Sequence, residues 1–308
     1  MARSVLRGDE RPTWALIVAC YAIWFAATAA VGTAPPAFAV LALAPAILAT
    51  ALHASLQHEA LHGHPTRSAA LNEALVFPAL GLAYPYRRFR ELHLRHHHDE
   101  RLTDPWDDPE SWYLTAGRVR TLPPPLRVAL EANRTLLGRM ILGPWLGAAG
   151  LLARDLPALR AGEARILDAW LRHLAGVVAV LLWLGAVGVP IWLYVVGVAW
   201  PAAALIYVRT FIEHRAAVDP GHRTAIVEAG RFWSLLFLNN NLHAVHHAAP
   251  TLPWHRLPER WRARRGAVLA RNGGHSVPGY GPVFRRWLFS PREPLAHPFA
   301  RRGDADEA

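Results

Sequence analysis

The sequence predicts an all-α membrane protein in which four transmembrane helices form two hairpins and the other residues form a cytoplasmic helical cap. Two observations predict this fold. Of the 308 residues, 53% are hydrophobic and only 18% are charged, so the chain is more apolar than an average soluble protein. Four apolar runs also approach the roughly 20 residues that a helix needs to cross the hydrocarbon core. We therefore expect residues 1–308 to form a single membrane domain.

The four apolar runs form two pairs, and a very short turn joins each pair. The runs span residues 13–31, 37–52, 174–189 and 191–212. The uncharged sequence GTAPP joins the first pair, and Pro190 joins the second. Turns this short predict two helical hairpins. The segments expected to form the cap are residues 53–173 and 213–308.

Arginine predicts the orientation of the hairpins. All 33 basic residues are arginines; none lies in either turn, whereas the N-terminal arm (Arg3, Arg7 and Arg11), the cap and the C-terminal tail are rich in them. By the positive-inside rule, we expect both termini and the cap to face the cytoplasm, in the inner membrane if the source is bacterial. A secretory signal is the alternative for the first run, but the run is longer than a usual signal core and has a hairpin partner.

Two weaker apolar stretches, residues 74–82 and 136–152, contain proline, glycine or arginine, and we expect them to lie at the membrane interface. The one cysteine, Cys20, falls inside an apolar run. It excludes a disulfide framework and a thiolate metal site. Any metal ion would therefore need histidine and oxygen ligands.

Three clusters of histidine lie in the segments expected on the cytoplasmic side. They are His58 and His62; His93, His96 and His97; and His243, His246 and His247. Residues three and four apart share one face of a helix, so each cluster is expected to present its imidazoles toward a common point. Neutral imidazole is the commonest metal ligand in proteins. Eight imidazoles exceed the four ligands of a structural zinc ion, which predicts two metal ions.

The repeated HxxHH spacing is the specific part of this pattern. With 17 histidines in 308 positions, one HxxxH is expected by chance about once. HxxHH is expected on the order of 0.05 times, yet it occurs twice. Imidazole suits iron, zinc, copper and nickel alike, so the ligand type alone does not select the metal.

The order HEALH, HLRHH and HAVHH, with the first box beyond a second membrane run and the third beyond a fourth, resembles the membrane fatty acid desaturase and hydroxylase family. The resemblance extends over residues 13–258. It implies a four-helix anchor, a cytoplasmic cap and two non-haem irons that activate dioxygen to attack an unactivated C–H bond of a lipid or acyl chain. It also implies a separate electron donor, such as ferredoxin or a cytochrome b5-like protein with its reductase, and no nucleic acid partner.

Further ligands are expected near these boxes. The family usually has one more ligand between the fourth helix and the third box, and His214 is the candidate; the alternative is a helix-terminal histidine. Asn239 and Asn240 precede His243 by four and three residues, so one could supply oxygen to a metal or water, or both could cap helices. Asp104 is the candidate carboxylate for a ligand's second N–H; a proline-broken polar loop is the alternative.

Other polar residues receive simpler interpretations. We expect these histidines not to bind metal: His53, His64, His98, His173, His222, His255, His275 and His297. Two arginine groups could contact phosphate headgroups or an acidic redox partner, or could simply be solvated. They are Arg87, Arg88 and Arg90, and Arg262, Arg264 and Arg265.

Three rival functions remain open at this point. HEALH also matches the HExxH pattern of zinc proteases, with Glu59 as general base, but that reading leaves both HxxHH clusters unused. A metal carrier would place ionisable ligands inside the membrane runs, which hold almost none. Carotenoid ketolases and hydroxylases share the three boxes, and HHAAPTLPWHRLP is similar to their continuation after the third. No feature separates desaturation from hydroxylation, and we expect desaturation.

Overall fold

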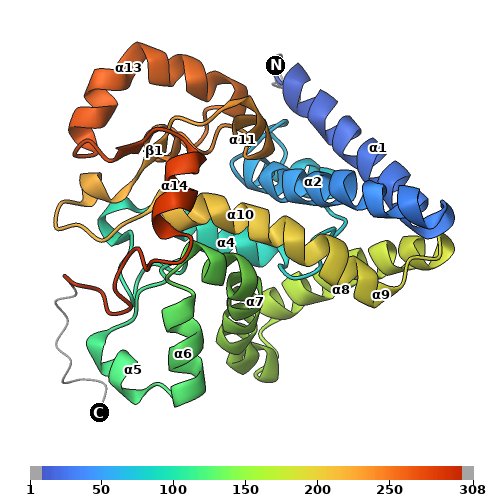
Figure 1. The fold of residues 1–308 in the computed structure, drawn as a ribbon, viewed down its shortest axis with the longest axis horizontal. Coiled ribbons are helices and arrows are strands. Elements are labelled where there is room, and N and C mark those ends of the chain that lie inside the picture. The colour runs from blue at the N-terminus through green and yellow to red at the C-terminus, as the bar shows by residue number, and fades with distance from the viewer. Residues whose placement is uncertain (1–8, 300–308) are drawn as a thin grey trace.

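Five long helices build the apolar part of the protein in the computed structural model, which describes residues 9–299 (Figure 1). They are α1 (Arg11–Thr33), α2 (Pro36–Leu61), α7 (Leu136–Arg160), α8 (Ala164–Ala186) and the continuous helix of α9 (Ile191–Tyr194), η2 (Val195–Ala199) and α10 (Trp200–Glu213). Within the described residues, each of these five is long and apolar enough to cross a membrane. The mostly helical fold is as the sequence predicts. Arg3 and Arg7 of the basic arm lie outside the described residues.

Three of the expected membrane runs fall within these helices, and the third run, residues 174–189, ends three residues beyond α8. At most other ends the helices extend further than the apolar runs. The structure continues α2 without a break to Leu61, so His58 lies in its last turns rather than beyond it. Prolines near the first residue of α1 and α2 suit helix starts, because the missing N–H would be unpaired there. The fourth run contains five residues of π-helix, η2, which the apolar pattern does not reveal.

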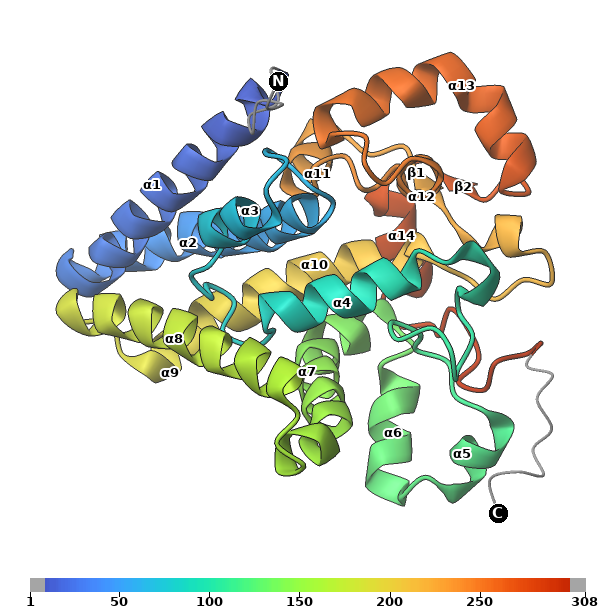
Figure 2. The same ribbon diagram turned by 180° about the vertical axis from the view of Figure 1, so that it is seen from behind.

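The cap is made of shorter elements that gather around the same end of α2 and α10 (Figure 2). The helices are α3 (Ala69–Leu75), α4 (Tyr86–His96), α5 (Ala116–Thr121), α6 (Pro124–Ala132), α11 (Arg231–Leu236), α12 (His243–Ala248), α13 (Leu257–Arg271) and α14 (Tyr280–Trp287). Single 3₁₀ turns are η1 (Asp99–Arg101), η3 (Pro220–Arg223) and η4 (Trp254–Arg256). The weak stretch 74–82 is mostly loop after α3.

One small departure from an all-α fold lies in this cap. Strands β1 (Ile226–Val227) and β2 (Ser276–Val277) form a two-residue parallel pair, with Ile226 opposite Ser276. Backbone bonds then tie β1 to its neighbours: Ala225 N donates to Glu213 O at 2.9 Å, and Ala244 N donates to Ala225 O at 3.0 Å. The pair therefore links the end of α10 to the start of α12.

The two hairpin turns meet in space. A Cβ atom at Gly32 would lie 1.8 Å from the carbonyl oxygen of Val187, so only glycine fits where the first turn contacts the second. Deeper between the hairpins, Trp24 Nε1 donates to Tyr194 Oη at 2.9 Å, and Tyr194 Oη donates to Leu80 O at 2.8 Å. Both turns therefore lie on the same side of the protein.

Contact between the turns bears on whether α7 crosses the membrane. If both turns lie on one side, the chain between them must cross an even number of times. The helices α2 and α8 account for two crossings, and α7 would make three. Both ends of α7 are also tied to the cap: Leu137 N donates to Leu288 O at 3.0 Å, and Arg88 of α4 donates to Asp155 at 2.7 Å. By length and composition α7 could cross the membrane. Its contacts instead favour four membrane spans, with α7 not among them.

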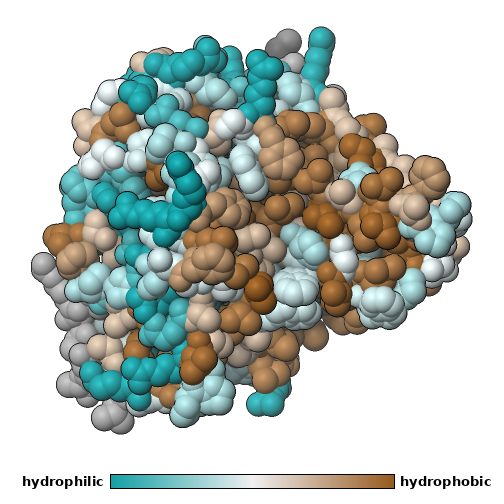
Figure 3. Space-filling model, viewed as in Figure 1, coloured by the Kyte–Doolittle hydropathy of each residue, from teal (hydrophilic) through white to brown (hydrophobic). Residues whose placement is uncertain are grey.

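The surface separates an apolar from a polar region (Figure 3). Hydrophobic residues cover the part of this face over α1, α2, α9 and α10, whereas hydrophilic residues gather over α13 and the C-terminal segment. Large apolar side chains are exposed on the long helices: Leu41 of α2 and Leu182 of α8 are each 70% exposed, and Trp192 of α9 is 68% exposed. Apolar patches of this extent mark contact with lipid, so the protein is an integral membrane protein.

Cysteine labelling tests the four-span topology. In a Cys20→Ala chain, Thr33→Cys and Ala186→Cys place thiols in the two turns, whereas Arg120→Cys and Glu163→Cys place them in the cap. We expect an impermeant maleimide to label the first two from outside intact cells, and the other two only after permeabilisation. If α7 crosses, Glu163→Cys will label from the opposite side to Arg120→Cys.

Candidate metal centre

Four segments that are far apart in sequence meet where α2, α4, α10 and α12 converge. The end of α2 carries His58 and His62, and α4 carries the second histidine cluster. His214 follows α10 directly, and α12 consists almost wholly of the third cluster. Many of the rings pack edge to face; the ring centroids of His62 and His97, for example, lie 4.7 Å apart with the planes at 84°.

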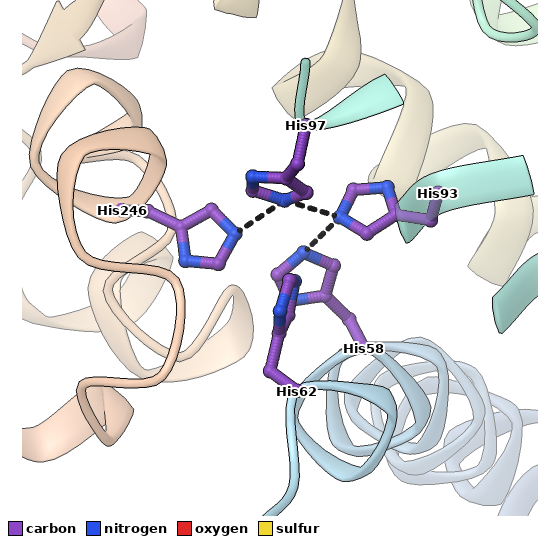
Figure 4. A group of neighbouring side chains, drawn as sticks. All are labelled: His58, His62, His93, His97 and His246. Atoms are coloured by element: carbon purple, nitrogen blue, oxygen red, sulfur yellow. Dashed lines mark hydrogen bonds between the residues drawn. The ribbon is translucent and has the colours of Figure 1, made fainter. Parts of the chain in front are cut away.

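Five imidazoles form the first of two groups (Figure 4). Its members are His58, His62, His93, His97 and His246. Each offers one nitrogen, and these nitrogens all lie within 4.8 Å of one another. The Nε2 atom of His93 lies 3.0 Å from those of His58 and His97, and His97 Nε2 lies 3.2 Å from His246 Nε2. Figure 4 shows the rings from three elements turned toward one central point.

Four imidazoles form the second group within the same limit of 4.8 Å. Its members are His96, His214, His243 and His247. The Nε2 atom of His214 lies 2.9 Å from the Nε2 atoms of both His96 and His243. Together the groups contain all nine histidines that the sequence analysis proposes as ligands.

Each HxxHH box contributes to both groups, which corrects the expectation that a cluster converges on one point. His93 and His97 are four residues apart and share the first group, whereas His96 joins the second. In the third box, His246 joins the first group and its neighbour His247 the second. Successive helical residues point about 100° apart, so two adjacent histidines address two adjacent sites. The paired HH is the feature that places the groups side by side.

The residues present fit two metal ions. Two nitrogens bound at right angles at about 2.1 Å would lie about 3.0 Å apart, close to the observed spacings of 2.9–3.2 Å. His62 Nε2 is buried and has no hydrogen-bond partner in residues 9–299, so its lone pair or proton faces the group. The opposite nitrogen of His93, Nδ1, lies 2.9 Å from Glu110 Oε1. A neutral His93 that donates to Glu110 has a bare lone pair at Nε2.

Three carboxylates orient the ligands from behind. Besides Glu110, Asp108 Oδ1 lies 2.8 Å from His96 Nδ1, and Glu213 Oε1 lies 3.2 Å from His243 Nδ1. Arg209 Nε lies 2.8 Å from the same oxygen of Glu213. Carboxylates in this position fix the ring orientation and make the imidazole more basic. Glu213, directly before His214, is the partner that the sequence signals most plainly, because it adjoins an expected ligand.

Asp104 is not such a partner, which corrects the sequence prediction. Its Oδ1 accepts hydrogen bonds from the backbone amides of Trp106 and Asp107, both at 2.9 Å, as in a capped turn. That turn positions Asp108 four residues later, which also accepts from Thr103 N at 2.8 Å. Asp104 is thus part of the polar loop, the alternative given above, and Asp108 is the carboxylate that contacts a histidine ligand. A linear pattern does not show which aspartate of the loop faces the histidines.

The two asparagines differ. Asn239 has a positive φ of 56° and donates from Nδ2 to Trp254 O at 3.0 Å, so its side chain is committed to a turn. Asn240 is buried, with Oδ1 3.1 Å from His243 Nδ1 and Nδ2 3.4 Å from His58 Nε2. Asn240 therefore touches one histidine of each group, and Asn239 touches neither.

Burial sets the protonation of most imidazoles. Burial, with a further contribution from His93 and His96, lowers the pKa of His97 to about 2. The pKa of His246 is lowered for the same reason, with His62 and His97 adding to burial. Burial also lowers the pKa of His96, but Asp108 and Glu110 outweigh it and raise this pKa to about 9. The lowered groups are neutral at pH 7, as metal binding requires, and at His96 a metal ion competes with one proton.

Outside the two groups, the expected non-ligands lie apart from the centre. Tyr21 Oη, for example, lies 3.2 Å from His53 Nε2, and Nε2 of His173 lies 3.0 Å from Leu82 O. Glu59, the general base of the protease alternative, accepts a hydrogen bond from Trp254 N at 3.0 Å. Its carboxylate thus joins the first histidine box to the segment after the third.

Arginines proposed for headgroups are largely engaged by the protein. Arg87 pairs with Glu73 at 2.7 Å and also with Asp168. Arg88 is buried and pairs with Asp155. On α13, Arg265 pairs with Glu228 at 2.9 Å. The ion pairs of Arg87 and Arg88 therefore hold α3, α4, α7 and α8 together, which leaves these two arginines little capacity to bind an anionic lipid.

A cavity of about 490 Å³ opens beside the metal centre. His93, His96, His214 and His243 form part of its wall, and α2, α7 and α10 form much of the rest. The α7 and α10 walls include small or apolar residues, among them Gly147, Gly150, Ala202, Ala203 and Ile206, together with polar ones such as Arg139 and Tyr207. This volume lies within the range of about 300–1,000 Å³ typical of small-molecule sites.

The fold and this site define a class: an integral membrane protein with two buried groups of histidines, each of which could hold a metal ion. The chain belongs to the fatty acid desaturase family, whose model matches residues 32–277. The matched segment includes all nine histidines and four of the five long helices almost completely. Membership of this family implies oxidoreductase activity. None of the curated proteins compared with the chain matches it.

Exchange of Asp108 tests the role of the supporting carboxylates. Asp108→Asn removes the charge behind His96 while keeping the shape of the side chain. We expect metal affinity to fall roughly 10- to 100-fold, measured as the metal retained after a chelator challenge. Asp104→Asn is the matched control and should retain metal like the unchanged protein. Equal retention by both variants would contradict the assignment.

His214→Ala tests whether this residue is the ninth ligand. The four-histidine group would keep three imidazoles, and the five-histidine group would be intact. We expect metal content to fall from about two ions per chain to about one, measured by elemental analysis of anaerobically purified protein. His98→Ala alters an exposed histidine beside His97 and should leave the content unchanged. Two retained ions in His214→Ala would remove His214 from the ligand set.

Proposed function

We propose that this chain is a membrane-bound non-haem diiron oxidoreductase that uses dioxygen and external electrons to desaturate, or hydroxylate, the aliphatic chain of a lipid. The observation that carries the proposal is the pair of adjacent histidine groups at the wall of the cavity. One metal alone would need only one of these groups. Two metals at one cavity wall suit a reaction in which both act on the same bound molecule.

The five-histidine group would hold one iron and the four-histidine group the other. When bound, the irons supply the oxidising power that no protein side chain has, through reduction of dioxygen with two external electrons. Imidazole ligands do not by themselves exclude zinc. The family, whose members typically carry two irons, supports iron as the native metal.

The protein's own residues supply position and a controlled environment. Glu110 accepts a hydrogen bond from Nδ1–H of His93, and Asp108 accepts one from Nδ1–H of His96, which keeps the Nε2 atoms of both histidines directed at the metal positions. Gly147, Ala202 and Ile206 line the cavity with small or apolar surface, which suits a methylene chain and disfavours water. A chain held there would lie against the histidines of both groups.

The electrons would come from another protein, such as ferredoxin or a cytochrome b5-like protein with its reductase. The cap is the proposed docking side, because the metal centre lies at the cap end of α2 and α10. We place that end in the cytoplasm, on the basis of the arginine distribution.

Two alternatives fare differently. The zinc protease requires Glu59 beside the metal, whereas Glu59 accepts from Trp254 N, and both HxxHH boxes join the two groups. The carotenoid alternative rests on the segment after the third box. That segment packs against the rest of the protein through Trp254. Its backbone amide donates to Glu59, its indole Nε1 donates to Thr13, and its carbonyl accepts from Asn239. These contacts give the segment a structural role, so its similarity to carotenoid enzymes does not by itself support a carotenoid substrate.

Product analysis tests the proposal directly. Membranes containing the protein are supplied with ferredoxin, its reductase and NADPH, and incubated with labelled acyl lipid or with β-carotene. We expect new double bonds in the acyl chains, dependent on dioxygen and lost in His93→Ala, measured by mass spectrometry.

Oxygen-18 incorporated into a carotenoid ring, with acyl lipids unchanged, would instead establish the carotenoid alternative. Peptide hydrolysis without dioxygen that is lost in Glu59→Gln would establish the protease. Glu59→Gln should otherwise affect stability more than chemistry, because its partner is a backbone amide.

A further inference from the structure

Arg139 is a buried charge without a carboxylate partner. It lies in the first turn of α7, is 7% exposed, and lines the cavity. Its Nε donates to Asn133 O at 3.2 Å, and no carboxylate of residues 9–299 lies within ion-pair distance. The guanidinium carbon stands 4.0 Å from the centroid of the Trp112 ring, a contact that leaves the Nη donors unpaired.

Other buried arginines of the protein have their charge or donors satisfied. Arg88 is paired with Asp155, and Arg209 lies against Glu213. Arg292 donates from Nη1 to the carbonyl oxygens of Phe211 and His214, both at 2.7 Å. A buried charge without a partner is costly, so a guanidinium of this kind that faces a cavity is a candidate for binding an anionic ligand.

The surroundings of Arg139 leave room for a ligand and provide a second donor. A Cβ atom at Gly143 would lie 3.0 Å from Arg139 Cδ and 3.2 Å from Tyr207 Cδ1, so this glycine lets both side chains pack over α7. Tyr207 Oη lies 2.9 Å from Tyr84 Oη. These two hydroxyls share one hydrogen bond, so the second proton has no acceptor among the described residues. Both tyrosines line the cavity.

Arg139 lines the same cavity as four of the nine histidines. Its guanidinium carbon is 5.8 Å from the centroid of the Phe211 ring, and Phe211 precedes the ligand His214 by three residues. The cavity therefore has an anion-attracting wall and a histidine wall with apolar surface between α7 and α10. Such a site suits an amphipathic molecule whose polar end is held by Arg139 while its chain lies against the histidine wall.

We propose that Arg139, assisted by a hydroxyl of the Tyr84 and Tyr207 pair, binds an oxyanion at the end of the substrate's alkyl chain. The shared chemistry is a carboxylate or a phosphate, both of which accept several hydrogen bonds from a guanidinium. This inference rests on the proposed function, because it assumes that the cavity takes a lipid chain. It makes Arg139 a specificity determinant that distinguishes acidic lipids from neutral ones.

Binding measurements test the proposal without turnover. The full chain in nanodiscs of neutral phospholipid is titrated with three probes of equal length: octadecanoate, octadecyl phosphate and octadecanol. We expect at least one anion to bind roughly ten- to a hundredfold more tightly than the alcohol. Preference for octadecanoate would identify a fatty acid as the source, and preference for octadecyl phosphate a phosphorylated headgroup.

Variants then locate the preference. Arg139→Leu keeps the apolar stem and should lose the anion preference while binding octadecanol normally, which also reports an intact cavity. If Arg139→Leu loses octadecanol binding as well, Arg139→Gln is tested in its place, because it removes the charge but keeps a polar end. We then compare its binding of the two anions with its binding of octadecanol. Arg160→Leu removes an exposed arginine at the other end of α7 and should preserve the preference.

Two results would overturn the inference: equal binding of all three probes by the unchanged protein, or an anion preference that survives in Arg139→Leu and Arg139→Gln. The measurement needs neither dioxygen nor a reductant. A failed oxidation assay with a clear anion preference would therefore count against the proposed function alone, and the reverse result against the role of Arg139 alone.

Discussion

Convergence of nine imidazoles in a dry interior is the constraint on which the rest of the structure depends. Each group brings its nitrogens within 4.8 Å of one another, at positions from which water is largely excluded. Neutral rings tolerate this burial better than charged ones, but their lone pairs still need a partner. Metal ions would supply that partner at Nε2, while a carboxylate interacts with Nδ1 on the opposite side of the ring, as Glu110 does for His93.

Ligands separated by nearly 190 positions in sequence must be held in place by other contacts. The backbone bonds around β1 join the end of α10 to α12, which fixes His214 against His243. Trp254 ties the segment after α12 to Glu59 of α2. The hairpins lock through Gly32 and Val187 at the far end. A preorganised frame of this kind allows a redox centre to keep its ligand geometry.

The position of the centre follows from the contrast between the apolar and polar halves of the molecule. The exposed apolar surface of α1, α2, α9 and α10 suits lipid, whereas the cap carries most of the paired charges. The cavity lies between these regions and has both kinds of wall. A molecule with a long tail and a polar end can satisfy both walls at once, which links the architecture of the membrane domain to the choice of substrate.

The sequence by itself determined the membrane class, the two hairpins and the histidines, because hydropathy and the HxxHH spacing are local properties of the chain. It did not determine how adjacent histidines divide between two groups, which follows from helix geometry once the segments meet. It selected Asp104 where Asp108 contacts His96, since the two differ only in how the loop folds back. Nothing in the sequence distinguishes Arg139 from the other arginines, of which the chain has 33 in all. Its isolation from carboxylates is a property of packing, and only the tertiary structure decides which charges find partners.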